Sequence, residues 1–186
     1  MELQTQRLIL RAWKESDAEA LYHYASNPNV GPIAGWAPHT SVENSREIIR
    51  SVLAVPETYA VVLKETGEAI GSIGLIPPHC DPQALKRADS ECEIGFWIGE
   101  PYWGQGLIPE AVTRLLCHAF ENLQQTTVWC GYYDGNEKSR RVQEKCGFVY
   151  SHREDNKPVP LLHESRTAHF TKISREEWEK RRANVS

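Results

Sequence analysis

Two glycines close together in the segment Tyr102–Ala111 are the first feature of this chain that suggests chemistry. They follow a strand-like run, 92–98, and precede a segment with the apolar spacing of a helix. Glycine adopts backbone angles that other residues avoid, so Gly104 and Gly106 let peptide N–H groups approach a ligand closely. The first turn of a helix adds unpaired donors and the positive dipole end, and Pro109 suits the first helical position. The pattern predicts a site for a phosphate or diphosphate.

The turn lacks the residues that mark two common phosphate sites. No Gly-Lys-Ser/Thr follows it, which argues against a nucleoside triphosphate held by lysine and magnesium. A dinucleotide fingerprint would place a third glycine near position 109, where this chain has proline. A tight strand-to-helix connection without a ligand would need the same two glycines. The rest of the sequence therefore has to distinguish a phosphate site from a purely structural turn.

A second segment, Asn136–Phe148, has the pattern of a short helix that ends at Gly147 before another strand. Together with the glycine turn, its Asn-x-x-Ser and Glu-Lys-Cys-Gly-Phe sequences resemble the GNAT superfamily of acetyl-CoA-dependent N-acetyltransferases. The runs Thr5–Arg11 and Glu93–Ile98 look like its ribosomal-protein N-acetyltransferase (RimJ/RimL-like) branch. The resemblance covers nearly the whole chain.

The resemblance implies a site for acetyl-CoA as the acetyl donor. Its diphosphate is expected on the backbone of the glycine turn, at Gly104, Gln105, Gly106, Leu107 and Ile108. The N–H groups expected to pair with the pantetheine amides and to polarise the thioester carbonyl are those around Phe96, Trp97 and Ile98. Asn136 and Ser139 are further candidate contacts. Ile108 stands where the family usually has a small residue, and its side chain could crowd the diphosphate.

Acetyl transfer requires a neutral amine and a group that accepts its proton. At pH 7, deprotonation costs about 1 kcal/mol for an N-terminal α-amine and roughly 4.6 kcal/mol for a lysine side chain, so an N-terminal amine is the easier acceptor. Glu93 is the candidate base, because it shares one strand face with Glu91, opposite the apolar Cys92 and Ile94. Glu91 or water could take the same proton, and two solvated carboxylates would need no catalytic role.

The group that protonates the departing thiolate has no obvious candidate. Many GNAT enzymes have a tyrosine four residues before the glycine that ends the second helix, but this chain has Gln143, which cannot donate a proton in that way. Ser139 is the replacement candidate, directly or through water. A serine on a helix surface and an asparagine at a helix start are also ordinary residues, so Ser139 and Asn136 have structural alternatives.

These residues must be positioned by alternating strands and helices. Alternating or β-rich runs predict strands at 5–11, 59–64, 69–76, 91–98, 126–133, 148–153 and 165–173. Capping signals and apolar spacing predict helices at 16–26 (Ser16 with Glu19), 40–53 (Thr40 with Glu43), from the glycine turn through Phe120, at 136–146, and from Ser174 (with Glu177) onward. The order predicts an α/β (α+β layered) GNAT-like fold: one domain, 1–186, with a mixed, mostly antiparallel sheet of about seven strands flanked by helices.

Composition excludes several other classes. A net charge of −4, from 21 basic and 25 acidic residues, argues against a nucleic-acid partner. No apolar run approaches the ~20 residues that span a bilayer, and no signal-peptide pattern opens the chain, so a cytoplasmic protein without membrane contact is expected. The five cysteines, Cys80 among them, lack Cys-x-x-Cys spacing, and the histidines lack metal-ligand spacing, so neither a disulfide framework nor a metal site is expected.

The leading hypothesis is an enzyme that moves acetyl from acetyl-CoA to a primary amine, with the N-terminal α-amine of a protein such as a ribosomal protein as the favoured acceptor. A small amine, such as a polyamine, an aminoglycoside or an amino acid, is the alternative, and the loop 28–39 with Trp36 would decide between them. A non-catalytic acyl-CoA-binding module is a third hypothesis, which Gln143 keeps open. The oligomeric state is also open, with a homodimer as one option.

Overall fold

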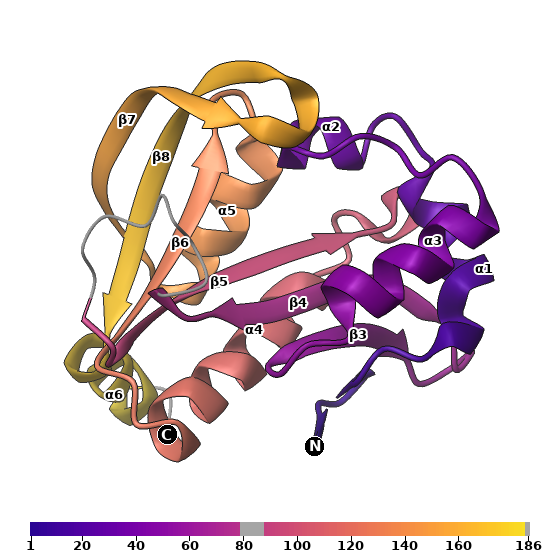
Figure 1. Ribbon diagram of the computed structural model, residues 1–186. Coiled ribbons are helices and arrows are strands. Elements are labelled where there is room, and N and C mark those ends of the chain that lie inside the picture. The colour runs from indigo at the N-terminus through magenta and orange to yellow at the C-terminus, as the bar shows by residue number, and fades with distance from the viewer. Residues whose placement is uncertain (79–87, 185–186) are drawn as a thin grey trace.

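The computed structural model describes residues 1–78 and 88–184. Over these residues the chain forms one mixed sheet of eight strands with helices on both faces (Figure 1). The strands lie in the order β1 (Glu2–Gln4), β2 (Leu8–Arg11), β3 (Thr58–Leu63), β4 (Ala69–Ile76), β5 (Glu91–Ile98), β6 (Thr127–Tyr133), β8 (Glu164–Ser174) and β7 (Val149–Val159). Neighbouring strands are antiparallel, except that β5 and β6 run parallel. The expected α/β fold with a mostly antiparallel sheet is confirmed.

Strands β5 and β6 separate soon after they meet. Their pairing ends at Glu93 and Trp129, whereas β5 stays paired with β4 as far as Ile98 and β6 stays paired with β8 as far as Tyr133. Figure 1 shows the two strands diverging from this junction. Beyond Glu93, the backbone groups on one edge of β5 therefore face an opening in the sheet instead of a neighbouring described strand.

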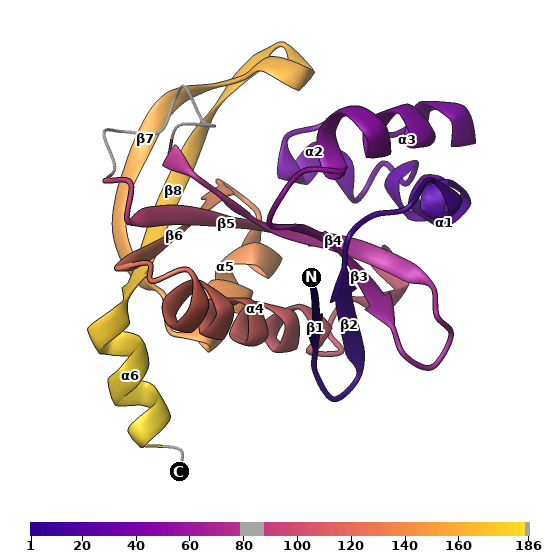
Figure 2. The ribbon, with the colours of Figure 1, turned by 60° about the horizontal axis from the view of Figure 1, so that its bottom comes forward.

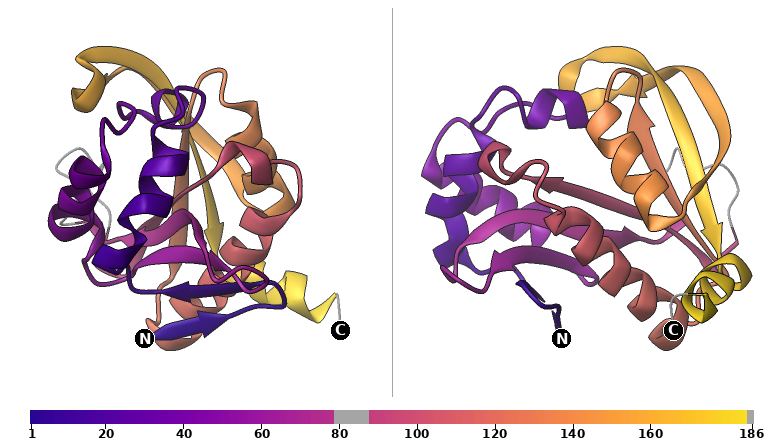
Figure 3. Two further views of the ribbon diagram at one scale, coloured as in Figure 1. Left: turned by 90° about the vertical axis from the view of Figure 1, so that its right-hand side faces the viewer. Right: turned by 180° about the vertical axis from the view of Figure 1, so that it is seen from behind.

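Two layers of helices enclose the sheet. Helices α4 (Leu107–Cys117) and α5 (Glu137–Cys146) cover one face, and α1 (Ala18–Ala25), α2 (Gly31–Ala34) and α3 (Val42–Ile48) lie over the other (Figures 2 and 3). The apolar stripe predicted after the glycine turn packs α4 onto the strands, because its residues are buried in the main core: Ala111, Val112, Leu115 and Leu116, with Ala119 and Phe120 in the wider π-type turn that follows. A smaller core lies under α1 and α3.

The last helix, α6 (Arg175–Ala183), begins with the capping box that the sequence predicts. The Ser174 hydroxyl accepts from the Glu177 N–H at 3.2 Å, and the Glu177 carboxylate accepts from the Ser174 N–H at 2.8 Å. These bonds satisfy N–H groups that a helix start leaves without a partner. Trp178 anchors the helix, because its ring lies 5.1 Å from that of Phe120 in the main core.

Several predicted boundaries are wrong. The expected strand 5–11 begins only at Leu8, as β2, because residues 5–7 form a turn in which the Thr5 hydroxyl accepts from the Leu8 N–H at 2.9 Å. The residues before this turn form β1, which was not predicted and is the eighth strand of the sheet. Strand β7 extends to Val159, six residues beyond the predicted end at Arg153. Helix α2 lies in the segment expected to be a loop, with Pro32 in its first turn.

Two predicted helix caps are also displaced. Ser16 does not cap α1, because a 3₁₀ turn over Glu15–Asp17 precedes it and the Asp17 carboxylate accepts from the Lys14 N–H at 2.9 Å. The cap of α3 is Ser41 instead of Thr40, with its hydroxyl accepting from the Asn44 N–H at 3.0 Å. Most of the expected loop 77–90, and Cys80 with it, lies outside the described residues.

Candidate active site

A cavity of about 920 Å³ lies at the opening between β5 and β6. It brings together segments from β5, the glycine turn, α5, α2 and β8. The sequence-predicted residues that line it are Phe96, Trp97, Ile98, Gly104, Gly106, Leu107, Ile108, Asn136 and Ser139. Of the described residues predicted at the site, Gln105, Glu93 and Trp36 are not part of this lining.

The glycine turn has the geometry of an anion cradle. Gly104 has φ 77° and Gly106 has φ 75°, both in the left-handed region that favours glycine. A side chain at Gly104 would meet no described atom within 4 Å, and one at Gly106 would meet only Arg7 at 3.7 Å, so both backbones are open to a ligand. Because α4 begins at Leu107, its first N–H groups point toward the turn. The turn therefore fits the diphosphate of acetyl-CoA.

Two residues of this turn differ from expectation. Pro109 is the third residue of α4 instead of the first, a position whose N–H would also lack an intrahelical partner. The Ile108 side chain is only 5 % exposed and packs in the main core, so the expected crowding of a diphosphate has no support. The side chain of Gln105 donates to the Pro101 carbonyl at 2.8 Å, which leaves its backbone as the part that can contact a ligand.

An ion pair that sequence reasoning missed braces the glycine turn. The Arg7 guanidinium donates to the Gln105 carbonyl at 3.0 Å and to the Glu110 carboxylate at 2.7 Å. Glu110 also accepts from the Arg7 N–H at 2.8 Å and from the Thr5 hydroxyl at 2.5 Å. Although partial burial alone would raise it, these bonds hold the pKa of Glu110 below its usual value. The β1–β2 turn thereby fixes the start of α4.

The first turn of α5 brings a cap and a hydroxyl to the cavity. The Asn136 side-chain oxygen accepts from the Ser139 N–H at 3.2 Å, which confirms Asn136 as the N-cap, and its amide donates to the Ile33 carbonyl at 3.4 Å. The Ser139 hydroxyl accepts from the Gln143 amide at 3.0 Å. Gly147 ends the helix in the left-handed conformation, as predicted.

Three basic residues that sequence reasoning did not select also line the cavity from α5. They are Lys138, Arg141 and Lys145. Their spacing of three and four residues places them along one side of a helix, a signal that was readable in the sequence. The Lys138 ammonium also lies 4.0 Å from the centre of the Trp103 ring, which lines the cavity beside the glycine turn. This positive side of the cavity suits the phosphate groups of a nucleotide.

Glu91 and Glu93 lie at the closed end of the opening. Cys92 and Ile94 are buried on the opposite face of β5, as the alternation predicts. The Glu91 carboxylate accepts from the Trp129 indole N–H at 2.7 Å. Glu93 is the last residue of β5 that pairs with β6, so it stands where the two strands part.

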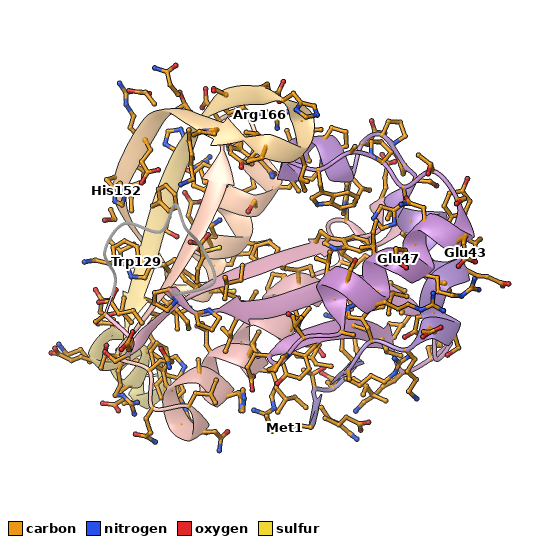
Figure 4. All side chains as sticks on the ribbon, in the orientation of Figure 1. Met1, Glu43, Glu47, Trp129, His152 and Arg166 are labelled. Carbon is orange, nitrogen blue, oxygen red and sulfur yellow. The ribbon has the colours of Figure 1, made fainter. Side chains whose placement is uncertain are left out.

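Residues of α2, of the segment before it and of the β7–β8 hairpin also line the cavity. Residues 28–30 and 32–34 line it, and the Arg166 guanidinium, labelled in Figure 4, donates to the Pro32 carbonyl at 2.6 Å. Glu100 contributes an acidic group whose pKa is lowered by hydrogen bonds from Asn27 and Asn29. Trp36, expected at the acceptor site, packs edge-on against Trp97 at 5.5 Å instead of lining the cavity.

Two other kinds of feature are absent from the described part of the chain. Among residues 1–78 and 88–184, no helix combines the length and the apolar character that a bilayer crossing requires. The same residues contain no cluster of three or more histidine, cysteine or acidic side chains arranged to hold a metal ion.

Comparison with known proteins identifies the family. A family model described as an acetyltransferase (GNAT) domain matches residues 7–149. The chain is 31% identical over 151 residues to the "Uncharacterized N-acetyltransferase p20" of Bacillus licheniformis, covering 78% of this chain and 81% of that protein. It is 34% identical over 98 residues to the "Putative ribosomal N-acetyltransferase YdaF" of Bacillus subtilis, covering 51% of each.

The fold agrees with this match. A solved acetyltransferase (GNAT family) structure from Bacillus anthracis superposes with a TM-score of 0.79 at 21% identity, covering 95% of this chain and 99% of that one. Acetyl-CoA is the acetyl donor that this family uses, and the glycine turn beside the β5–β6 opening fits it. The chain belongs to the GNAT family of N-acetyltransferases.

Proposed function

We propose that this enzyme acetylates an N-terminal α-amine of a protein, such as a ribosomal protein, with acetyl-CoA as donor. The observation that carries the proposal is the cavity at the β5–β6 opening, where the glycine turn, the free edge of β5 and Ser139 meet. An α-amine is the easier acceptor, since its deprotonation at pH 7 costs about 1 kcal/mol against roughly 4.6 kcal/mol for lysine. The name of the relative YdaF points to the same class of acceptor.

Acetyl-CoA would supply the thioester, and the chain would hold it at three places. The backbone of residues 104–108 receives the diphosphate at the start of α4. Lys138, Arg141 and Lys145 place positive charge along the neighbouring wall. The edge of β5 at residues 96–98 offers backbone groups to the pantetheine amides, although the Ile98 carbonyl already accepts from the Trp103 indole at 3.0 Å.

Glu93 is the proposed base for the amine proton. It is the last residue of β5 that pairs with β6, so it stands where the opening begins. Ser139 is the proposed proton donor to the departing thiolate, because its hydroxyl lines the cavity and Gln143 does not. The proposal also includes the RimJ/RimL-like branch, a cytoplasmic location and a homodimer.

A small amine is the second candidate acceptor. The Arg166–Pro32 bond joins the β7–β8 hairpin to α2 at the wall of the cavity. An acceptor that enters beside this bond is a slender chain end or a small molecule, so the contact is compatible with both candidates.

A thiol-release assay with a panel of amines tests the acceptor. The panel holds short peptides with free N-terminal serine or alanine, their N-acetylated counterparts as controls, a polyamine, an aminoglycoside and free amino acids. The proposal expects turnover with the free peptides and none with the blocked ones. Turnover with the small amines alone would show that a small amine, and not a protein N-terminus, is the acceptor. No turnover with any amine would contradict the proposal.

A further inference from the structure

The most unusual polar side chain near the cavity is that of Gln143. It is 1 % exposed, and it lies between α5 and the sheet. Its amide nitrogen donates to the Gly131 carbonyl at 3.2 Å and to the Ser139 hydroxyl at 3.0 Å, and its oxygen accepts from the Thr171 hydroxyl at 2.7 Å. A buried amide costs stability unless it is paired, and these contacts pair it.

The orientation of this amide follows from the Gly131 carbonyl. A carbonyl oxygen can only accept, so the nitrogen of Gln143 has to face Gly131. Turning the amide over would place two oxygens against each other. The second N–H of the same nitrogen then points at the Ser139 oxygen.

This arrangement determines which hydrogen bonds the Ser139 hydroxyl can still make. A serine hydroxyl has one hydrogen and two lone pairs, and the Gln143 N–H occupies one lone pair. The Ser139 O–H donates to no described residue, and the side chain lines the cavity. The hydrogen is therefore available to a group bound there. An N–H donated to the oxygen also stabilises the negative charge that grows on it as the proton leaves.

We propose that Gln143 is a positioning residue that fixes the Ser139 hydroxyl as a hydrogen-bond donor to the sulfur of CoA. The inference rests on the proposed role of Ser139. In the transfer, the amine nitrogen forms a bond to the acetyl carbon, the carbon–sulfur bond breaks, and its electron pair goes to sulfur. As the sulfur takes the Ser139 proton, a water molecule gives a proton to the serine oxygen in the same step, so that no serine alkoxide forms. The amine proton goes to Glu93 or to water.

The test titrates the thiol of CoA bound to the protein, followed by the ultraviolet absorbance of the thiolate. It requires CoA alone and no acceptor. A donor to the thiolate lowers the thiol pKa, so Ser139→Ala is expected to raise it by about one unit and Gln143→Leu by about half a unit. In the double variant the thiol pKa is expected to equal that of Ser139→Ala, because Gln143 acts through Ser139.

Thr171→Val is the matched control, since it removes another bond of the same amide but keeps both N–H donors. It is expected to leave the thiol pKa within about 0.2 unit of wild type, even if the melting temperature falls. CoA affinity by calorimetry and the melting temperature establish that each variant is folded.

The outcomes separate the two claims. If Ser139→Ala raises the thiol pKa as expected but Gln143→Leu leaves it unchanged, the positioning role of Gln143 alone is overturned. The same holds if Gln143→Leu still changes the thiol pKa when Ser139 is already replaced by alanine. Equal thiol pKa values in wild type and Ser139→Ala would remove Ser139 as the donor, and with it the inference. No binding of CoA to the wild-type protein would overturn the proposed function itself.

Discussion

The two acidic residues of β5 differ in where they stand along the strand. Glu91 lies within the part of β5 that pairs with β6, while Glu93 marks the point where β5 leaves β6 and the opening begins. A base must lie within hydrogen-bond reach of the amine or of a water beside it. The position of Glu93 at the closed end of the opening makes it the better candidate of the two.

We expect Glu93→Gln to keep the affinity for acetyl-CoA and to lower turnover by roughly 10²–10⁴, since general-base catalysis contributes about that much. The loss should shrink as pH rises, because a larger fraction of the amine is then already neutral. Initial rates from pH 6 to 10 with the best acceptor measure this. Glu91→Gln is the matched control, with a smaller loss. A Glu93→Gln rate equal to wild type at neutral pH would exclude Glu93 as the base.

Ser139→Ala should lower turnover by about tenfold to a hundredfold, less than Glu93→Gln, because a thiolate whose parent pKa is about 8.5 leaves with little help. Ser51→Ala is the control, since Ser51 is an exposed serine outside the cavity lining. Single-turnover rates are the measurement, so that product release does not hide the chemical step. If Ser139→Ala has the single-turnover rate of wild type, the departing thiolate takes its proton from solvent and not from Ser139.

Individual residues were predictable where the signal was local. The left-handed glycines, the Asn136 cap and the two faces of β5 all follow from residues close in sequence. The role of Gln143 could not be predicted from the sequence, which shows only that a tyrosine is missing at this position. The partners of Gln143, Gly131 and Thr171, lie on two strands that only the fold brings together.

At the scale of elements, the glycine turn is held from outside by the β1–β2 turn. Arg7 and Thr5 hold Glu110 in the first turn of α4, and Arg7 also binds the Gln105 carbonyl. A cradle made of backbone N–H groups is useful only if those groups are fixed before the ligand arrives. The brace supplies that rigidity to a segment that contains two glycines.

This brace predicts a pH dependence of stability. The folded pKa of Glu110 lies below its usual value of 4.5, so its ionised form stabilises the native state above about pH 4.5. That contribution is lost as pH falls through the lowered folded pKa. We expect Glu110→Gln to be less stable than wild type at pH 7 and to differ less at pH 3. Urea unfolding at both values measures the difference. If the free energies of unfolding of wild type and Glu110→Gln differ by the same amount at pH 7 and pH 3, the charge of Glu110 is not involved.

The elements were predicted best where a short pattern defines them. The stripe of α4 and the capping box of α6 are examples. The turn at residues 5–7, and with it β1, was missed because no glycine or proline marks the turn, and its bonds to Glu110 cross about a hundred residues of sequence. The length of β7 was missed because its residues 154–159 are mostly polar and gain their register from β8.

At the scale of the whole molecule, the site exists only because one pair of strands separates. Alternating patterns predict β5 and β6 but not that their pairing ends at Glu93 and Trp129. The separation opens the sheet between its two helical layers, with the glycine turn and α5 on one side and α2 on the other (Figure 2).

Calorimetric titration of CoA into Gly106→Val tests the central claim most directly, namely that the glycine turn at this opening binds the diphosphate. Gly67→Val is the matched control, because Gly67 has φ 71°, open surroundings and a place in the β3–β4 turn outside the cavity lining. Both variants carry similar backbone strain. We predict wild-type affinity in Gly67→Val and, in folded Gly106→Val, affinity weakened at least about a hundredfold, which is roughly 2.7 kcal/mol. Unchanged affinity in folded Gly106→Val would contradict the account.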